Sequence, residues 1–246
     1  MPTVTKNLII INVLAFFGTI VAQRYKIDLN WYLGLHLFSS PDFNAAQLIT
    51  YMFMHSGFTH IFFNMFAVFM FAPILEQTWG SRRFLLFYIA CGIGAALIQE
   101  GVQYIHISTL EGQLSQATLQ EVYTHGRDLL LNGMTYGDAS GGPNAIGALN
   151  VALYGETVGA SGAVYAILLA FGMLYPNNRL FVFPLPVPIK AKYFVIGYAA
   201  IELWAGISNA PGDNVAHFAH LGGMLFGLFF ILYWKKKDKS NGTYYS

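Results

Sequence analysis

The chain has 246 residues, of which 55% are hydrophobic, 16% aromatic and only 10% charged, and its mean hydropathy is +0.49. This is too little charge to coat a water-soluble domain, so the composition predicts a membrane protein. The net charge of +1 argues against a nucleic-acid-binding surface, and a single cysteine, Cys91, excludes an internal disulfide.

Six apolar stretches are long enough to cross a bilayer, which takes about 17 to 25 residues. In chain order they cover residues 7–23, 58–78, 83–104, 160–176, 191–209 and 214–234. A polar insertion, 105–158, separates the third stretch from the fourth. The sequence therefore predicts an all-α, polytopic membrane bundle of six transmembrane helices, formed as a single domain over residues 1–246. An extended outer loop is expected between helices three and four.

Basic residues predict how the six spans are oriented. With the N-terminus in the cytoplasm, three basic residues lie outside, namely Arg24, Lys26 and Arg127. Ten lie inside: Lys6, Arg82, Arg83, Arg179, Lys190, Lys192, Lys235, Lys236, Lys237 and Lys239. This asymmetry follows the positive-inside rule. We expect both termini in the cytoplasm and the protein in a bacterial inner membrane or a plasma membrane.

The insertion divides into two parts. Ser108 and Glu111 have the spacing of a capping box, which predicts that an amphipathic helix begins there. The second part, 133–155, contains six glycines and predicts a loop. Both parts are expected on the outer side, because three spans precede them.

Three spans begin with polar side chains, which are costly at membrane depth and therefore indicate function. They are His60 and Asn64 on the second span, Ser161 and Tyr165 on the fourth, and His217 and His220 on the sixth. The first two pairs have a spacing of four residues, so each shares one helical face. Because spans two, four and six run from outside to inside, their starts are predicted to meet in a shallow pocket near the outer face.

These residue types predict nucleophilic catalysis by a serine. A histidine within hydrogen-bond reach can take the proton of a hydroxyl, so His220 is expected to activate Ser161. Attack on a carbonyl builds negative charge on oxygen, which needs hydrogen-bond donors. His60, Asn64 and the backbone N–H of Ser161 are the expected donors.

Glycines surround the predicted site and indicate close approach of backbones. Gly159 and Gly162 flank the serine, which leaves room for a substrate and for the sixth helix. Gly223, followed by a glycine four residues later, has the spacing that lets two membrane helices pack closely. Spacing alone does not choose between His217 and His220, but this glycine stripe favours His220 as the buried base. His217 is then expected at the rim.

Together these motifs resemble the rhomboid intramembrane serine proteases. The motifs are Gly159-x-Ser161-Gly162, His60-x-x-x-Asn64, and Ala219-His220-Leu221-Gly222-Gly223 followed by Gly227. The resemblance covers all but the insertion and implies a rhomboid-like bundle that cleaves transmembrane protein substrates within the lipid bilayer. It implies a serine–histidine dyad without a third, acidic member, and neither a metal nor an organic cofactor.

The resemblance also implies roles for residues around the dyad. Tyr165 is expected to stack against His220 and orient it. His55, just before the second span, is expected to support the site, and Glu76, at the inner end of that span, to have a structural role. The chain departs from the family pattern in its first outer loop, residues 24–50, which lacks a Trp-Arg pair.

Several alternatives stay open. Ser140 also precedes two glycines, but no apolar helix follows it, which favours a turn. The histidines at 55, 60, 217 and 220 are a possible metal set, disfavoured because no carboxylate or thiolate accompanies them in the sequence pattern. A catalytically inactive rhomboid-like protein that binds membrane clients is opposed by the presence of both dyad residues. A small transporter is opposed because the polar groups gather near one face.

Overall fold

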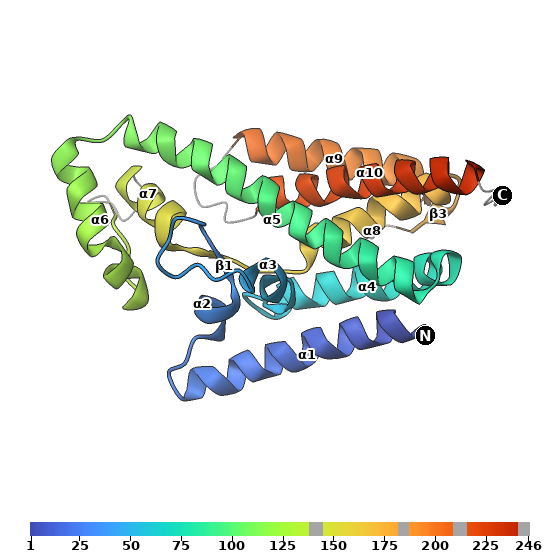
Figure 1. Ribbon diagram of the computed structural model, residues 1–246, viewed down its shortest axis with the longest axis horizontal. Coiled ribbons are helices and arrows are strands. Elements are labelled where there is room, and N and C mark those ends of the chain that lie inside the picture. Colours follow the sequence, from blue (N-terminus) through green and yellow to red (C-terminus); the bar gives the residue numbers. More distant parts are fainter. Residues whose placement is uncertain (138–144, 182–186, 209–215, 241–246) are drawn as a thin grey trace.

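The computed structural model describes residues 1–137, 145–181, 187–208 and 216–240. Over these ranges the protein is a bundle of helices packed side by side (Figure 1). In this described part, four helices are long and apolar enough to cross a membrane, namely α1 (Thr3–Arg24), α4 (Phe58–Trp79), α5 (Ser81–Glu111) and α10 (His217–Ser240). Two further apolar helices, α8 (Ser161–Leu174) and α9 (Ala191–Ser208), complete the bundle.

Each of the six predicted spans coincides with a helix. Two of them do not meet the length and hydropathy expected of a membrane-crossing helix. The first, α8, has only 14 residues, and the second, α9, includes Lys192 and Glu202 among its 18 residues. Four helices therefore qualify as membrane-crossing by length and composition, whereas the count of six spans stays a prediction.

The helix α8 lies at the centre of the bundle. It packs against α4, α5, α9 and α10, and nine of its 14 residues are buried. Figure 1 shows that α1 begins and α10 ends at the same end of the molecule. The helices α4, α8 and α10 all begin farther toward the opposite end, so their first turns can form one site.

Glycines allow α8 to cross α5 and α10 at close range. A Cβ atom on Gly223 of α10 would overlap the backbone of Gly162 on α8. A Cβ atom on Gly162 would in turn overlap the side chain of Ala95 on α5. Because any side chain at these glycines would separate the helices, the close crossing depends on them.

The connection between the third and fourth predicted spans is mostly helical where it is described. The helix α5 continues to Glu111, so Ser108 lies inside it and the prediction of a helix start there was wrong. The next helix, α6 (Gln116–Leu131), begins after Ser115, whose hydroxyl accepts from the backbone N–H of Thr118 at 3.2 Å. A third helix, α7 (Ala145–Tyr154), occupies part of the segment predicted as a loop, because its apolar residues outweigh its glycine.

The insertion has a small core of its own and is tied to the first outer loop. Val122 of α6 and Leu149 of α7 are fully buried in this core. Arg127 of α6 donates to both carboxylate oxygens of Asp42, at 2.6 and 2.7 Å. These hydrogen bonds hold the pKa of Asp42 below its ordinary value. The first outer loop and the insertion therefore pack as one unit.

Short elements connect the first outer loop to the chain just before α8. That loop contains α2 (Leu29–Leu33) and α3 (Gln47–Thr50), and a 3-10 turn, η1 (Tyr51–Phe53), follows it. Strand β1 (Leu35–His36) pairs antiparallel with β2 (Glu156–Thr157), which leads into Ser161. At the other end of α8, β3 (Arg179–Leu180) pairs antiparallel with β4 (Ile189–Lys190). The helix α8 is thus held in place at both ends.

Glu76 joins three helices at the end of the bundle where the chain begins. Its carboxylate accepts from the backbone N–H groups of Val4 and Thr5 at 2.9 and 2.7 Å, and from the Thr5 hydroxyl at 2.7 Å. The Ser81 hydroxyl of α5 donates to the same carboxylate at 2.6 Å. The carboxylate therefore satisfies free N–H groups at the start of α1 and links α1 to α4 and α5.

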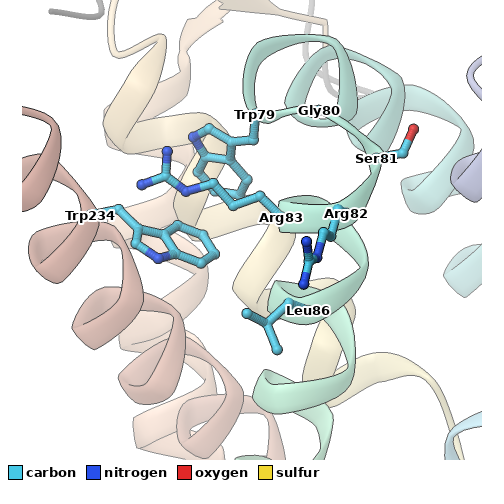
Figure 2. A pocket seen from close by; sticks show the side chains of 7 residues that line it. All are labelled: Trp79, Gly80, Ser81, Arg82, Arg83, Leu86 and Trp234. Carbon is cyan, nitrogen blue, oxygen red and sulfur yellow. The ribbon is translucent and has the colours of Figure 1, made fainter. Parts of the chain in front are cut away.

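A pocket of about 420 Å³ lies at the same end, between α4, α5 and α10. Figure 2 shows the side chains that line it, among them Trp79, Arg83 and Trp234. The guanidinium of Arg83 lies 4.3 Å from the ring centroid of Trp234, and its Nη1 is 2.9 Å from the carboxylate of Asp238. This cation–π contact and ion pair tie the start of α5 to the last turns of α10.

Candidate active site

Ser161 and His220 meet where two helices begin. Ser161 is the first residue of α8, and His220 lies in the first turn of α10. The serine Oγ is 2.8 Å from the Nε2 atom of His220, and the histidine is 8% exposed. This distance allows Nε2 to accept the hydroxyl proton, which is the contact that a nucleophile and its base require.

The ring of His220 is held on one face by Tyr165, one turn after Ser161 on α8. The two ring centroids are 4.2 Å apart and the planes differ by only 7°. Stacking of this kind restricts rotation of the imidazole. The geometry is the one that the sequence resemblance implied for Tyr165.

The carboxylate of Glu202, which no sequence motif indicated, completes this cluster. It lies on α9, is 6% exposed and accepts from the Nδ1 atom of His220 at 2.8 Å. The hydroxyl of Tyr165 donates to its other oxygen. A charged residue within an apolar span was a usable signal, because charge at membrane depth is costly. A single sequence did not indicate which helix start it would face.

His217 belongs to the same cluster and is partly buried, whereas His220 is buried, so the place of His217 at the rim stays a prediction. Its side chain is only 14% exposed, and its Nδ1 atom lies 2.6 Å from the same Glu202 oxygen that His220 contacts. The two histidines, three residues apart in the first turn of α10, therefore converge on one carboxylate oxygen.

A metal site was disfavoured because no carboxylate accompanied the histidines in the sequence pattern, and Glu202 shows that this reason was wrong. Glu202, His217 and His220 offer possible ligand atoms that all lie within 4.8 Å of one another. Ligand atoms around a tetrahedral zinc ion, each at about 2.0–2.1 Å from it, are separated by roughly 3.3 Å. The two carboxylate–imidazole distances, 2.6 and 2.8 Å, are shorter than this and fit hydrogen bonds.

The space beside the serine is bounded by Gly159 and His60. Gly159 has φ of +131°, a conformation that favours glycine. A Cβ atom on Gly159 would lie 2.7 Å from the Nε2 atom of His60 and 3.5 Å from the Oγ atom of Ser161. The absence of a side chain therefore leaves free the volume between the candidate nucleophile and a candidate donor.

A second candidate donor lies one turn farther along α4. Asn64 is 5% exposed, and its Nδ2 atom has no hydrogen-bond partner within the described residues. An unpartnered amide at a buried position is costly, and a donor kept for a ligand would account for it. His60 is oriented through its other nitrogen, Nδ1, which lies 3.1 Å from the hydroxyl of Ser56.

His55 packs behind this donor side of the site. It is 1% exposed, and its ring centroid is 5.0 Å from that of His60 in an edge-to-face arrangement. Burial lowers the pKa of His55 to about 4, and the neighbouring His60 adds to the shift. The ring is therefore neutral at physiological pH and supports His60 by packing. Ser140, the alternative serine, lies outside the described residues.

Comparison with known proteins places the chain in a family. A family model described as the Rhomboid domain matches residues 42–108 and 133–237, which together make up more than half of the chain. The chain belongs to the rhomboid family. The two matched ranges leave out residues 109–132, which include α6.

Three curated relatives show the range of similarity. Rhomboid protease AarA of Providencia stuartii is 29% identical over 182 residues, covering 72% of this chain and 51% of the relative. The YdcA protein of Bacillus subtilis (strain 168) is 42% identical over 64 residues, 25% of this chain and 32% of the relative. Rhomboid-like protein 16, chloroplastic, of Arabidopsis thaliana is 25% identical over 221 residues, covering 88% of this chain and 58% of the relative. This rhomboid therefore spans from 32% to 58% of the length of these relatives.

Family membership agrees with the apolar helices. This rhomboid is an integral membrane protein of a family that includes proteases. Some relatives carry the name rhomboid-like and belong to chloroplasts or mitochondria. The particular membrane and the catalytic activity of this chain are therefore matters for proposal.

Proposed function

We propose that this rhomboid is an intramembrane serine endopeptidase that cleaves membrane proteins in or near their transmembrane segments. The observation that carries the proposal is the 2.8 Å contact between Ser161 Oγ and His220 Nε2. Neither an inactive client-binding protein nor a transporter requires a nucleophile and a base in contact. Family membership supports the same reaction class.

In the proposed reaction, the Oγ atom of Ser161 attacks the carbonyl carbon of the scissile bond while its proton moves to Nε2 of His220. His60, Asn64 and the backbone N–H of Ser161 donate to the oxyanion that forms. The C–N bond then breaks and His220 gives the proton to the leaving amine. Water hydrolyses the resulting acyl-enzyme, with His220 again as base.

The free volume beside Gly159 supports this assignment of the oxyanion hole. Ser56 Oγ lies 3.1 Å from Nδ1 of His60, and Nε2 is the atom nearest the position of a Cβ on Gly159. In the proposed reaction the Ser56 hydroxyl donates to Nδ1, so that Nε2 carries the proton and can donate to the oxyanion. A substrate oxygen in that space would lie between this donor and the attacking serine.

We further propose a single membrane domain with six spans, both termini in the cytoplasm and an active site that opens toward the outer face. The distribution of basic residues supports this orientation. It is also supported by Figure 1, in which the start of α1 and the end of α10 lie at one end and the insertion helices α6 and α7 at the other. A reporter fused to the C-terminus is expected to stay on the cytoplasmic side.

The function is tested by reconstituting the protein in liposomes with a panel of single-span membrane substrates. We expect the wild-type protein to cleave at least one of them and the Ser161→Ala variant to cleave none. Cleavage that persists in this variant would remove Ser161 as the nucleophile. Binding of substrates without cleavage by the wild type would instead favour the client-binding alternative.

A further inference from the structure

We propose that Glu202 is a positioning residue for His220, so that this rhomboid works with a serine–histidine–glutamate triad in place of a dyad. The inference rests on the proposed function. It departs from the family resemblance, which implies no acidic member.

The two ring nitrogens of His220 contact different groups, a hydroxyl at Nε2 and a carboxylate at Nδ1. Nε2 lies 2.8 Å from Ser161 Oγ, and Nδ1 lies 2.8 Å from Glu202 Oε2. An ionised carboxylate can only accept, so Nδ1 must carry a proton. In the neutral ring, Nε2 then keeps its lone pair and can take the serine proton. The carboxylate thereby selects the tautomer that the proposed reaction needs.

The carboxylate is itself fixed before any substrate arrives. The Tyr165 hydroxyl donates to Oε1, while His217 and His220 both contact Oε2. These partners come from α8 and α10, whereas Glu202 comes from α9. A carboxylate held from two other helices cannot swing away, which favours an orienting role.

The cost of burying Glu202 also needs an explanation. Only three residues of α9 are buried, and Glu202 is the only charged one. A buried charge in an apolar helix is unfavourable unless it is fully hydrogen-bonded, and apolar side chains pack helices at lower cost. A carboxylate at this position is therefore better explained by its effect on His220 than by its contribution to helix packing.

During the reaction the carboxylate would stabilise the charge that appears on the ring. When Oγ bonds to the carbonyl carbon, its proton moves to Nε2 and His220 becomes an imidazolium. Glu202 stays ionised and keeps its hydrogen bond from Nδ1–H, so the two opposite charges face each other. The charge disappears when Nε2 passes the proton to the leaving amine.

The test compares Glu202→Gln with the wild-type protein in liposomes. Glutamine keeps the size of the side chain but removes the charge, and its NH2 group can stabilise the wrong tautomer. We expect kcat to fall by about 10²–10⁴-fold, on the scale known for loss of a triad carboxylate. We expect KM to change by less than about threefold, because Glu202 does not contact substrate. Glu202→Asp, which restores an ionised acceptor, is expected to recover at least about tenfold of the lost kcat.

Glu100→Gln provides a matched control. Glu100 lies on α5, is also 6% exposed and accepts from the backbone N–H of Phe38 at 2.8 Å. It is a buried carboxyl group outside the Ser161–His220 cluster, so the kcat of Glu100→Gln is expected to stay within about threefold of wild type. A fall in kcat equal to that of Glu202→Gln would show a general effect of changing a buried carboxyl group and would overturn the proposal.

A second measurement on the wild-type protein does not depend on the folding of a variant. Solid-state NMR of ring-¹⁵N-labelled histidine, with His220 assigned through His220→Asn, reports which nitrogen carries the proton. We expect protonated Nδ1 and bare Nε2 in the neutral ring; the opposite tautomer would overturn the proposal. Full kcat in Glu202→Gln alongside an inactive Ser161→Ala rejects the triad alone, whereas cleavage by Ser161→Ala rejects the proposed function itself.

Discussion

Tyr165 contacts His220 in two ways, directly through its ring and indirectly through its hydroxyl. The ring stacks on the imidazole at 4.2 Å, and the hydroxyl donates to Glu202, which contacts His220 Nδ1 at 2.8 Å. One side chain of α8 therefore limits both the tilt of the imidazole and the position of its carboxylate partner.

The two contacts of Tyr165 are expected to contribute unequally to catalysis. Tyr165→Ala removes the ring and should lower kcat about 10²-fold, because the imidazole can then rotate away from Ser161. Tyr165→Phe keeps the ring and loses only the hydroxyl, so we expect less than about a tenfold loss. Steady-state cleavage rates measure both. Tyr198→Ala, which removes a ring that packs on Tyr165 at 6.0 Å, is the control, and an equal loss there would contradict the account.

Gly159→Ala is expected to abolish most of the activity without unfolding the protein. The new Cβ would lie 2.7 Å from His60 Nε2 and would fill the space assigned to the oxyanion. Together with the strain at φ of +131°, this should lower kcat by at least about 10²-fold. Gly101→Ala on α5 is the control, since a Cβ there meets nothing within 4 Å. Normal cleavage by Gly159→Ala would show that the oxyanion lies elsewhere.

Asn64→Ala tests the unpartnered amide. If Nδ2 donates only to the oxyanion, its loss should lower kcat about 10²–10³-fold and leave KM nearly unchanged. Since the amide has no partner within the described residues, the free energy of unfolding is expected to change little. Initial rates over a range of substrate concentrations separate the two constants. A rise in KM with normal kcat would instead assign Asn64 to substrate binding.

His55 is expected to make the stability depend on pH. The pKa of His55 is about 4 in the folded protein and 6.5 ordinarily. Between these two pH values, His55 is protonated in the unfolded chain and neutral in the folded protein. The free energy of unfolding should therefore decrease as the pH falls from about 6.5 toward 4. We expect the Tm in detergent to drop between about pH 7 and pH 5, and His55→Gln to reduce this drop. Equal drops in both proteins would contradict the buried, neutral state of His55.

Much of the fold was accessible from the sequence, because span length and the grouping of polar residues are local properties. The starts of α4 and α9, at Phe58 and Ala191, agree with the predicted spans to the residue. The insertion was harder: the capping-box spacing at Ser108 predicted a helix start, whereas α5 runs through it and the next helix begins after Ser115. The ion pair between Asp42 and Arg127 joins residues that are 85 positions apart, and no local sequence pattern predicts it.

In the candidate site, too, some features follow from local sequence patterns and others depend on how the helices pack. Ser161 and His220 were paired correctly in space because each opens a helix that runs in the same sense. Glu202 was missed because it lies near the middle of α9, and the sequence does not give the rotation of that helix about its axis. The contact between His217 and Glu202 was missed for the same reason, because it also depends on the rotation of α9.

The most direct test of the central claim is the site of capture by an alkyl fluorophosphonate, which reacts with an activated serine. The reconstituted protein is labelled, digested and mapped by mass spectrometry, with His220→Asn as the variant that lacks the base. We expect a single adduct on Ser161 in the wild-type protein and almost none in His220→Asn. An adduct at another serine, or equal labelling of Ser161 without His220, would contradict the account.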